Sequence, residues 1–545
     1  MRSGLHALNR HTWLCNGTSR KWHRANRLLG LFLLALVCAV PFGLAFAYES
    51  GLAPYLALVA FTPAMYVVGR LRAAAEVVLF SLVTSVLTIA MVTYWVPTAI
   101  ADMVAVGTAG AGLLSALLWL LWCGGNALFL IVYRYWHARH LLQVACLGVV
   151  LVNHWPSVFG VNPFISLMHA DALSGGAFFI GTTAIELLAI LFSAYLAKAA
   201  AEASLRPLLR ALPIVLTLLV LDYAAVWYSS LATSRSLTVA LVQAGNVYSQ
   251  KLASATDIEK FVRQITDGPG GGADLVVFSE NVFSFNFADD PTSANAALEA
   301  LKRFSAEREV AFLLSAVQAS PDEEPTEPGR AKNTRVSSQL INQGQLQGYA
   351  DKAKTIPFAE YTPSWAVAPF RWLGVKVESR APSYDYHQGM VKGVRIIPLT
   401  CFESIDQAVV ETRLDARPGL LVSQSNLDSF GQPGSSTYRA ALWAHMAHER
   451  RWTTQWQVPV VRAVKGGGST QVNAQGYLDQ ALLQQSWGQE WVSATVTVPE
   501  FTALNGALAL LRQVSAWLIG TLAFCYVAQG AVLYVRRKWL PGKAD

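Results

Sequence analysis

Three residues whose side chains could act together in covalent catalysis each lie at the end of a short strand-like run. Glu280 closes L-V-V-F-S-E, Lys352 follows Y-A-D, and Cys401 closes I-I-P-L-T-C. A thiol becomes a nucleophile when a neighbouring base takes its proton, and a carboxylate can be that base. An ammonium group can stabilise both the thiolate and a developing oxyanion. The three residues therefore predict a catalytic cysteine, and the alternative for Cys401 is a buried structural thiol.

Other motifs in the chain do not support a metal, cofactor or nucleotide site. The glycine-rich stretch 267–274 lacks the G-K-[ST] ending of a phosphate loop and indicates a turn before a strand. His445, His448 and Glu449 are near neighbours on a predicted helix, but H-M-A-H-E is not the H-E-x-x-H zinc motif. We therefore expect no metal and no cofactor, and a solvated or interface face on that helix.

The elements around these residues divide into a membrane part and a water-soluble part. Of the 545 residues, 53% are hydrophobic and 14% are charged. A bilayer core of about 30 Å needs roughly 20 apolar helical residues per crossing, and this composition predicts about eight such spans. The apolar runs lie near 27–47, 52–69, 75–95, 107–133, 141–160, 174–197, 211–230 and 513–535. No A-x-A-like site ends the first run, which argues against a cleavable signal peptide.

Basic residues predict which side of the membrane each loop occupies. The segments before the first run and after the second, fourth, sixth and last runs carry Lys and Arg, whereas the loops 48–51, 96–106 and 161–174 carry none. Basic loops stay in the cytoplasm, so both termini are expected there and the segment 232–510 outside. The net charge of +7 mostly reflects these anchors and does not indicate nucleic-acid binding.

The expected domains are a basic cytoplasmic tail (1–26), a membrane domain of about seven spans (27–231), an extracytoplasmic α/β domain (232–510) and a final span with a cytoplasmic tail (511–545). Cys401 is the one cysteine of the outer segment, which is unusual in a compartment that favours disulfides. Glu186 and Asp222 fall within predicted spans, where a carboxylate is usually functional, but neither receives a role.

The outer segment alternates strands and helices, which predicts a layered α/β domain. Its helical stretches are 294–307 and 436–452, and the Pro-rich stretch 320–333 indicates an exposed loop. The predicted strands are 238–243, 274–279, 310–316, 337–342, 394–400, 419–424, 458–464 and 492–498.

With these elements, the chain resembles the apolipoprotein N-acyltransferases, a membrane-bound family of the nitrilase superfamily, over nearly its whole length. The motifs that carry the resemblance are F-S-E at 278–280, K-A-K-T-I-P-F-A-E-Y-T-P at 352–363, C-F-E-S at 401–404 and R-A-V-K-G-G-G-S at 462–469. The resemblance implies an αββα sandwich with Glu280 as base, Lys352 as catalytic lysine and Cys401 as nucleophile. It also implies supporting roles for Glu360, Phe402 and Glu403, of which Glu403 is expected to shape the site rather than to act as base.

The resemblance implies a reaction at the periplasmic face of a bacterial inner membrane. Cys401 would take an acyl group from a membrane phospholipid and pass it to the N-terminal amine of a lipoprotein. The motif S-N-L-D-S-F-G at 425–431 departs from the family's S-N-D-A-W-F-G, and Leu252 and Lys465 replace its Trp and Asn. These departures keep open an alternative, in which the same chemistry processes or cyclises another membrane peptide such as a conjugative pilin. A non-catalytic scaffold is a third reading, which the intact trio disfavours.

Substrates that are lipids must reach the site from the bilayer. The stretch 361–375 follows the lysine motif and contains Trp365, Phe370 and Trp372, and aromatic residues of this kind favour the membrane interface. We therefore expect this stretch to form an arm for substrate access, and the alternative is that its aromatic residues pack within the domain.

Overall fold

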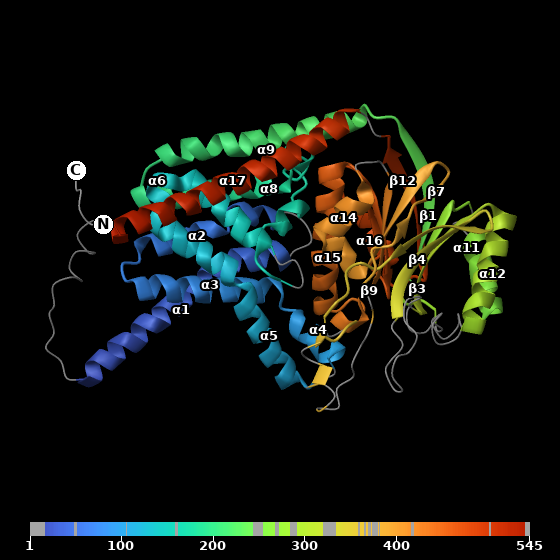
Figure 1. Cartoon of the computed structure of the whole chain (residues 1–545), viewed down its shortest axis with the longest axis horizontal. Coiled ribbons are helices and arrows are strands. Elements are labelled where there is room, and N and C mark those ends of the chain that lie inside the picture. Colours follow the sequence, from blue (N-terminus) through green and yellow to red (C-terminus); the bar gives the residue numbers. More distant parts are fainter. Residues whose placement is uncertain are drawn as a thin grey trace.

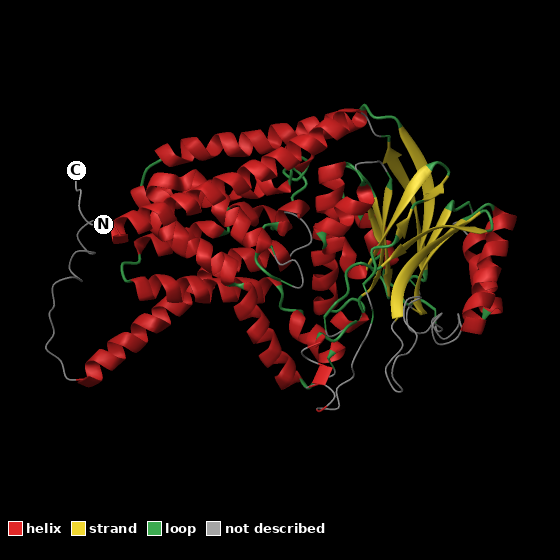
Figure 2. Cartoon of the chain, in the orientation of Figure 1, coloured by secondary structure: helices red, strands yellow, loops and turns green. Residues whose placement is uncertain are grey.

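In the computed structural model of the protein, a helical part and an α/β part lie side by side (Figures 1 and 2). The residues that the structure describes are 17–47, 52–104, 106–157, 162–243, 254–267, 272–283, 291–319, 334–357, 360–364, 367–368, 372, 380, 382–415, 419–500 and 503–539. The loop predicted at 320–333 therefore lies outside the described residues.

The helical part is formed by the N-terminal half of the chain and by the last helix. Its elements are α1 (Gly17–Ala47), η2 (Pro54–Leu58), α2 (Phe61–Arg70), α3 (Ala74–Val92), α4 (Val96–Met103), α5 (Thr108–Trp122), α6 (Gly124–His154), η3 (Ile165–His169), α7 (Ala177–Ile180), α8 (Thr182–Glu202), α9 (Arg206–Ser230) and α17 (Ala503–Trp539). α6 is two helices that meet at His140, whose backbone is not helical. α17 returns to the bundle after the α/β part, beside α6 (Figure 1).

Within the described residues, six helical stretches are long and apolar enough to cross a membrane. They are Ala25–Phe46, Ala74–Val92, Thr108–His137, Thr182–Glu202, Arg206–Ser230 and Leu504–Leu533. The predicted run 52–69 is instead divided into η2 and the ten-residue α2. Pro54 and Pro63 account for this division, because proline is favoured at helix starts and not in helix interiors. The run 141–160 yields the shorter apolar helix His140–His154, so the count of about eight spans is not confirmed.

The α/β part contains two sheets packed face to face, as the layered prediction requires. The seven-stranded sheet has the order β12-β1-β2-β3-β4-β5-β6, and the five-stranded sheet has the order β11-β10-β9-β8-β7. The strands are β1 (Ser234–Val242), β2 (Leu275–Phe278), β3 (Ala311–Ala319), β4 (Thr334–Asn342), β5 (Gln345–Asp351), β6 (Tyr386–His387), β7 (Gly389–Val391), β8 (Val394–Thr400), β9 (Leu420–Asn426), β10 (Val460–Lys465), β11 (Thr470–Val472) and β12 (Trp491–Pro499). Strands β1, β2 and β3 are parallel, and so are β8, β9 and β10.

Helices cover the outer face of each sheet and complete four layers. Apolar residues of α11 (Ala255–Asp267) and α12 (Pro291–Arg308) pack on one sheet. Those of α14 (Gln407–Leu414) and α15 (Ser436–Trp456) pack on the other, and α16 (Gln480–Ser486) lies near β11 and β12. Leu241 and Val277 of one sheet meet Ile396 and Val422 of the other in a shared core. The predicted α/β architecture is therefore confirmed.

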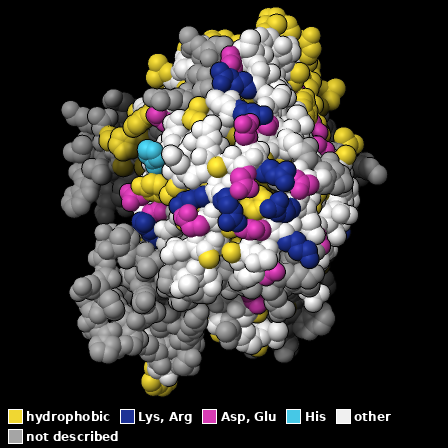
Figure 3. All heavy atoms as spheres, turned by 90° about the vertical axis from the view of Figure 1, so that its right-hand side faces the viewer, with side chains coloured by type: hydrophobic (Ala, Val, Ile, Leu, Met, Phe, Trp, Pro, Cys, Tyr) yellow, Lys and Arg dark blue, Asp and Glu magenta, His cyan; other side chains and the backbone are white. Residues whose placement is uncertain are grey.

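The two ends of the molecule differ in the surface that they present. The end farthest from the helical bundle carries Lys, Arg, Asp and Glu side chains interspersed (Figure 3), and ion pairs such as Arg308–Asp267 at 3.0 Å join α12 to α11. By contrast, the bundle exposes large apolar side chains along its length, among them Leu209, Val220, Trp227, Trp517 and Phe524. An apolar outer surface of this extent is suited to lipid rather than to water.

Helix α15 joins the two parts because both of its faces are buried. One face packs on the five-stranded sheet through Trp452, and on the other Trp443 stacks on His169 of η3 with ring centroids 3.7 Å apart. Arg451 Nε donates to Thr182 Oγ1 of α8 at 2.9 Å. Of the two readings for this helix, a solvated face and an interface face, the structure shows the interface.

The two carboxylates inside the bundle hold neighbouring segments together. Glu186 Oε1 accepts a hydrogen bond from Asn162 Nδ2 at 2.8 Å, and the same carboxylate contacts Asn153. Asp222 Oδ1 accepts one from the backbone N–H of Gly175 at 2.8 Å. Each buried carboxylate therefore joins two helices or a helix and a loop.

Candidate active site

The two sheets bring the predicted catalytic residues together at one edge of the sandwich. Glu280 follows β2 of the seven-stranded sheet and Cys401 follows β8 of the five-stranded sheet, so the face-to-face packing of the two sheets places these strand ends opposite each other. Buried polar contacts join the strand ends of the two sheets. Gln424 Nε2 donates to the Phe278 carbonyl at 2.6 Å, and Ser338 Oγ lies 2.7 Å from Gln424 Oε1 and 2.9 Å from Thr400 Oγ1.

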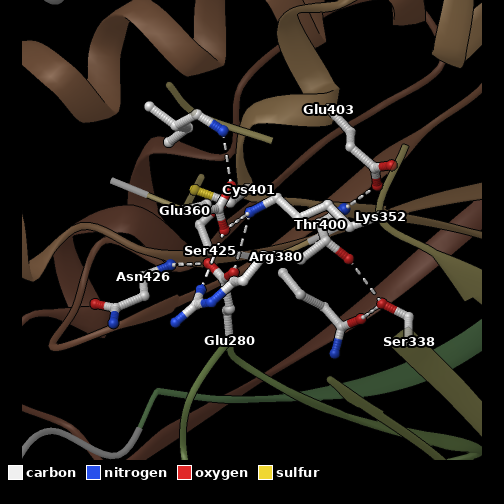
Figure 4. Close-up of polar contacts among 12 residues, drawn as sticks. Glu280, Ser338, Lys352, Glu360, Arg380, Thr400, Cys401, Glu403, Ser425 and Asn426 are labelled. Atoms are coloured by element: carbon white, nitrogen blue, oxygen red, sulfur yellow. Dashed lines mark hydrogen bonds and ion pairs between the residues drawn. The ribbon is translucent and has the colours of Figure 1, made fainter. Parts of the chain in front are cut away.

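Lys352 follows β5 and lies between two carboxylates (Figure 4). Its Nζ is 3.2 Å from Glu280 Oε1 and 2.7 Å from Glu360 Oε1, and its side chain is 1% exposed. Burial would lower the pKa of Lys352, but the charges of Glu280 and Glu360 outweigh it, so the net pKa is raised. Burial likewise opposes ionisation of Glu360, yet Lys352 and its hydrogen bonds hold that pKa below its usual value. The ammonium group therefore stays charged in this buried site.

Cys401 begins the short helix η4 (Cys401–Ile405), and its backbone lies in the left-handed region with φ +51°. Such a conformation is strained for a residue with a side chain and is frequently found at functional sites. Burial, followed by the negative charge of Glu280, raises the pKa of the Cys401 thiol to about 12, although Lys352 opposes the shift. At neutral pH the group is therefore a thiol, which must pass its proton to a base before it can attack.

Glu280 is buried, and both of its oxygens are engaged. Oε1 accepts from Lys352, and Oε2 accepts from the backbone N–H of Asn426 at 3.3 Å. This fixed position beside the ammonium and near the thiol suits a carboxylate that exchanges a proton with Cys401.

Glu403 holds the turn that carries Cys401 in place. Arg413 donates two hydrogen bonds to its carboxylate, at 2.6 and 2.7 Å. The other bonds come from the backbone N–H groups of Thr400 and Ala353, both at 2.7 Å. Glu403 thus links the turn after β8 to the residue that follows Lys352, an arrangement that agrees with its expected role in shaping the site.

The Glu403→Gln variant is expected to be less stable and less active. Breaking one side of a buried ion pair costs about 3–5 kcal/mol, because the remaining charge is left without its partner. Thermal unfolding of the purified variant should show a lower Tm than the parent protein. The matched control is Glu411→Gln, at a half-buried position of α14 whose side chain accepts a hydrogen bond from Gln407. An equal Tm for Glu403→Gln and the parent would contradict this role.

Several polar residues of the site were not anticipated from the sequence. Arg380 Nη1 lies 3.3 Å from Glu360 Oε1, Arg413 holds Glu403, and Arg462 pairs with Glu449 under the site. His445 Nδ1 lies 3.3 Å from Ser404 Oγ. Arg380 and Arg413 belong to no noted motif, and single charged residues are usually surface residues, so neither was predicted. Arg462 was noted only as the first residue of R-A-V-K-G-G-G-S, and His445 only as part of a helix face.

Two departures from the family motifs contact each other in the structure. Lys465 Nζ lies 2.9 Å from Asp428 Oδ2, so the lysine that replaces Asn pairs with the aspartate of S-N-L-D-S-F-G. The Asp428 N–H donates to Asn426 Oδ1 at 3.0 Å, and Asn426 in turn contacts Glu280. The altered loop is therefore connected to the predicted base Glu280 through Asn426. Leu252 lies outside the described residues.

A cavity of about 570 Å³ adjoins the site where the α/β part meets the ends of α5 and α6. Its walls include Ala353 and Phe402, the neighbours of Lys352 and Cys401, together with Tyr361, Arg380, Tyr384 and the helix-end residues Leu121 and Trp122. Apolar and aromatic walls with a few polar groups are typical of a small-molecule site.

Of the three aromatic residues expected in the access arm, Trp372 is described and is 85% exposed, so it does not pack within the domain. Trp365 and Phe370 lie outside the described residues.

The solved structures that are similar to this chain include carbon-nitrogen hydrolases of the nitrilase superfamily. One is a carbon-nitrogen hydrolase from Helicobacter pylori G27, with TM-score 0.36 and 11% identity over 51% of this chain and 93% of that one. Another is a Saccharomyces cerevisiae member of branch 10 of the nitrilase superfamily, with TM-score 0.33 and 13% identity over 52% of this chain and 95% of that one.

The curated proteins that resemble the chain carry a more specific name, apolipoprotein N-acyltransferase. The protein of Geobacter metallireducens is 26% identical over 209 residues, which are 38% of this chain and 37% of that protein. The protein of Allorhizobium ampelinum is 23% identical over 285 residues, which are 50% of each chain. The chain thus matches half or less of the length of these relatives, and no family model matches it. The resemblance that the motifs predicted is confirmed.

Proposed function

We propose that the protein is a membrane acyltransferase that transfers an acyl group from a phospholipid to the N-terminal amine of a lipoprotein, forming an amide. The observation that supports this most strongly is the buried set of Glu280, Lys352 and Cys401 beside a cavity that faces the apolar helices. The names of the curated relatives supply the acyl group and the lipoprotein acceptor.

In the proposed reaction, Glu280 takes the proton of the Cys401 thiol, and the thiolate attacks the carbonyl carbon of a phospholipid ester. The Lys352 ammonium stabilises the oxyanion that forms. The ester C–O bond then breaks, and Glu280 returns the proton to the glycerol oxygen, which releases a lysophospholipid and leaves a thioester. In the second half the acceptor amine attacks the thioester and gives up a proton through Glu280, so an amide forms and the thiol is regenerated.

The proposed location is a bacterial inner membrane with both termini in the cytoplasm and the α/β part in the periplasm. The alternation of basic and non-basic loops supports this orientation. The proposed domain bounds remain 1–26, 27–231, 232–510 and 511–545, and they are consistent with strands that begin at Ser234 and end at Pro499.

A second candidate keeps the thioester and changes the substrate. The Lys465–Asp428 ion pair joins the two motifs that depart from the family, and Asn426 connects Asp428 to Glu280. A charged pair where the family has Asn and a tryptophan-containing loop supports a different acceptor or donor, such as a membrane peptide that is processed or cyclised like a conjugative pilin.

The mass of the adduct trapped on Cys401 distinguishes the two candidates. Protein isolated from membranes and digested under acidic conditions should carry a fatty acyl thioester on the Cys401 peptide. A peptide adduct at the same residue would instead support the second candidate. No adduct on active protein would contradict the covalent mechanism in both forms.

The arm for substrate access makes a separate prediction. Replacing Trp365, Phe370 and Trp372 together with serine should lower thioester formation from vesicle phospholipid by about tenfold, because these aromatic side chains would no longer anchor the arm at the interface. The matched control is Trp136→Ser, which changes an exposed aromatic residue of α6 outside the arm. Unchanged thioester yield at an unchanged Tm would remove the arm from the mechanism.

A further inference from the structure

A second cavity lies in the helical bundle, at the end farthest from the α/β part. Its volume is about 370 Å³, and it opens among α2, α6, α8 and α9. α9 runs for 25 residues from this end to the start of β1, so its length is roughly 38 Å at about 1.5 Å per residue. That length exceeds a bilayer core of about 30 Å and places the cavity in the headgroup layer of the leaflet opposite the α/β part.

The charge of this cavity is positive. Arg70, Lys198 and Arg210 line it, and Glu202 is the one acidic residue among the lining residues that the structure describes. Glu202 lies 3.8 Å from Lys198 and is half exposed, so the ion pair is weak. Within the described residues, Arg70 and Arg210 form no ion pair with a carboxylate. Three cations that are opposed by only one weakly paired carboxylate in this lining favour an anionic ligand.

Contacts with the surrounding helices hold Arg70 in place. Arg70 Nη2 donates to the Ala201 carbonyl at 3.1 Å, and its guanidinium lies 5.0 Å from the centre of the Tyr66 ring. Tyr133 and Tyr195 add hydroxyl groups to the lining, whereas Met65 and Leu141 add apolar walls. A lining that combines cations with apolar side chains suits a molecule with a phosphate at one end and hydrocarbon at the other.

We propose that this cavity binds the headgroup of an anionic phospholipid. Basic pockets between membrane helices are suited to such headgroups, and each Lys or Arg near an anionic surface contributes about 1 kcal/mol. The site is separate from the candidate active site, since the lipid there is held by its phosphate and is not consumed. The inference does not depend on the proposed acyl transfer.

Native mass spectrometry of the full chain in detergent tests the proposal, with phosphatidylglycerol and phosphatidylcholine as probes. The parent protein should retain phosphatidylglycerol preferentially. The Arg70→Gln/Lys198→Gln variant should bind it about 25-fold more weakly, which is roughly fivefold per cation removed. Arg210→Gln, at an exposed position, should weaken binding about fivefold. The control Arg72→Gln, a neighbouring exposed cation outside the cavity, should leave the affinity unchanged.

Three outcomes would overturn the proposal. These are equal retention of the two lipids by the parent protein, unchanged affinity in Arg210→Gln, or an equal loss in Arg72→Gln. Displacement of the lipid by inorganic phosphate at the same concentration would assign the cavity to a soluble anion instead. Equal Tm values of parent and variants in phosphatidylcholine micelles show that the variants remain folded.

Discussion

The Cys401→Ser variant is expected to lose acyl transfer by roughly 10⁴-fold or more, because removal of a nucleophile eliminates the covalent route. The serine hydroxyl is a far weaker acid than the thiol, and the buried site that raises the pKa of Cys401 to about 12 would disfavour an alkoxide still more. The measurement is the transfer of a labelled acyl chain from phospholipid to an N-terminal peptide, together with the yield of thioester.

The control for this variant is Cys525→Ser. Cys525 is an exposed free cysteine on α17, and serine there removes a thiol without disturbing the candidate site. We expect parental activity and parental thioester yield for this control. Turnover of purified Cys401→Ser within tenfold of the parent would exclude a covalent cysteine.

The Glu280→Gln variant is expected to lose about 10²–10⁴-fold in turnover, the contribution typical of a general base. Glutamine keeps the shape of the side chain, and Lys352 keeps Glu360 as a counterion at 2.7 Å, so the fold should persist. Glu299→Gln, at an exposed position of α12, is the matched control and should retain full activity.

The same Glu280→Gln variant should make the Cys401 thiol more acidic while it loses activity. The negative charge of Glu280 raises the pKa of Cys401, so its removal lowers that pKa from about 12. Below the pKa, the thiolate fraction increases tenfold for each pH unit. The rate of alkylation by iodoacetamide follows this thiolate fraction. The curve of rate against pH should therefore lie at lower pH for the variant than for the parent. A shift to higher pH would show that Glu280 does not act on the thiol.

Much of the α/β part was predictable because its strands are short apolar runs bounded by turns. The predicted strand 394–400 coincides with β8, and the other seven predicted strands each overlap one observed strand. Of the missed strands, β6, β7 and β11 have two or three residues and lie at sheet edges, whereas β5 (Q-L-Q-G-Y-A-D), next to the edge strand β6, alternates polar residues with small or apolar ones. A strand with little of its surface buried needs few apolar residues, so its sequence lacks the apolar run that predicts a strand.

The candidate site was predictable where a motif fixes a residue, and not where tertiary packing does. Glu280 and Lys352 follow β2 and β5 of one sheet and Cys401 follows β8 of the other, and the face-to-face packing of the two sheets brings these strand ends together. Arg413 reaches Glu403 only because α14 packs beside β8, a contact that spacing alone does not reveal. The predicted count of about eight spans was not confirmed for a related reason. Hydropathy does not detect the helix starts favoured by Pro54 and Pro63, which divide the run 52–69.

The double burial of α15 also determines how far the reactive thiol can travel. Because this helix packs on the sheet through Trp452 and on the bundle through Trp443 and Arg451, the α/β part is fixed to the bundle and cannot tilt away. Cys401 therefore stays at a constant distance from the helical bundle. In the proposed membrane orientation, such a protein selects its substrates by reach, since only a bond that lies at the level of Cys401, or a chain long enough to extend to it, can be attacked. A fragment of residues 234–499 would expose the bundle-facing side of α15 to water. We therefore expect that this fragment, expressed without the bundle, is not soluble.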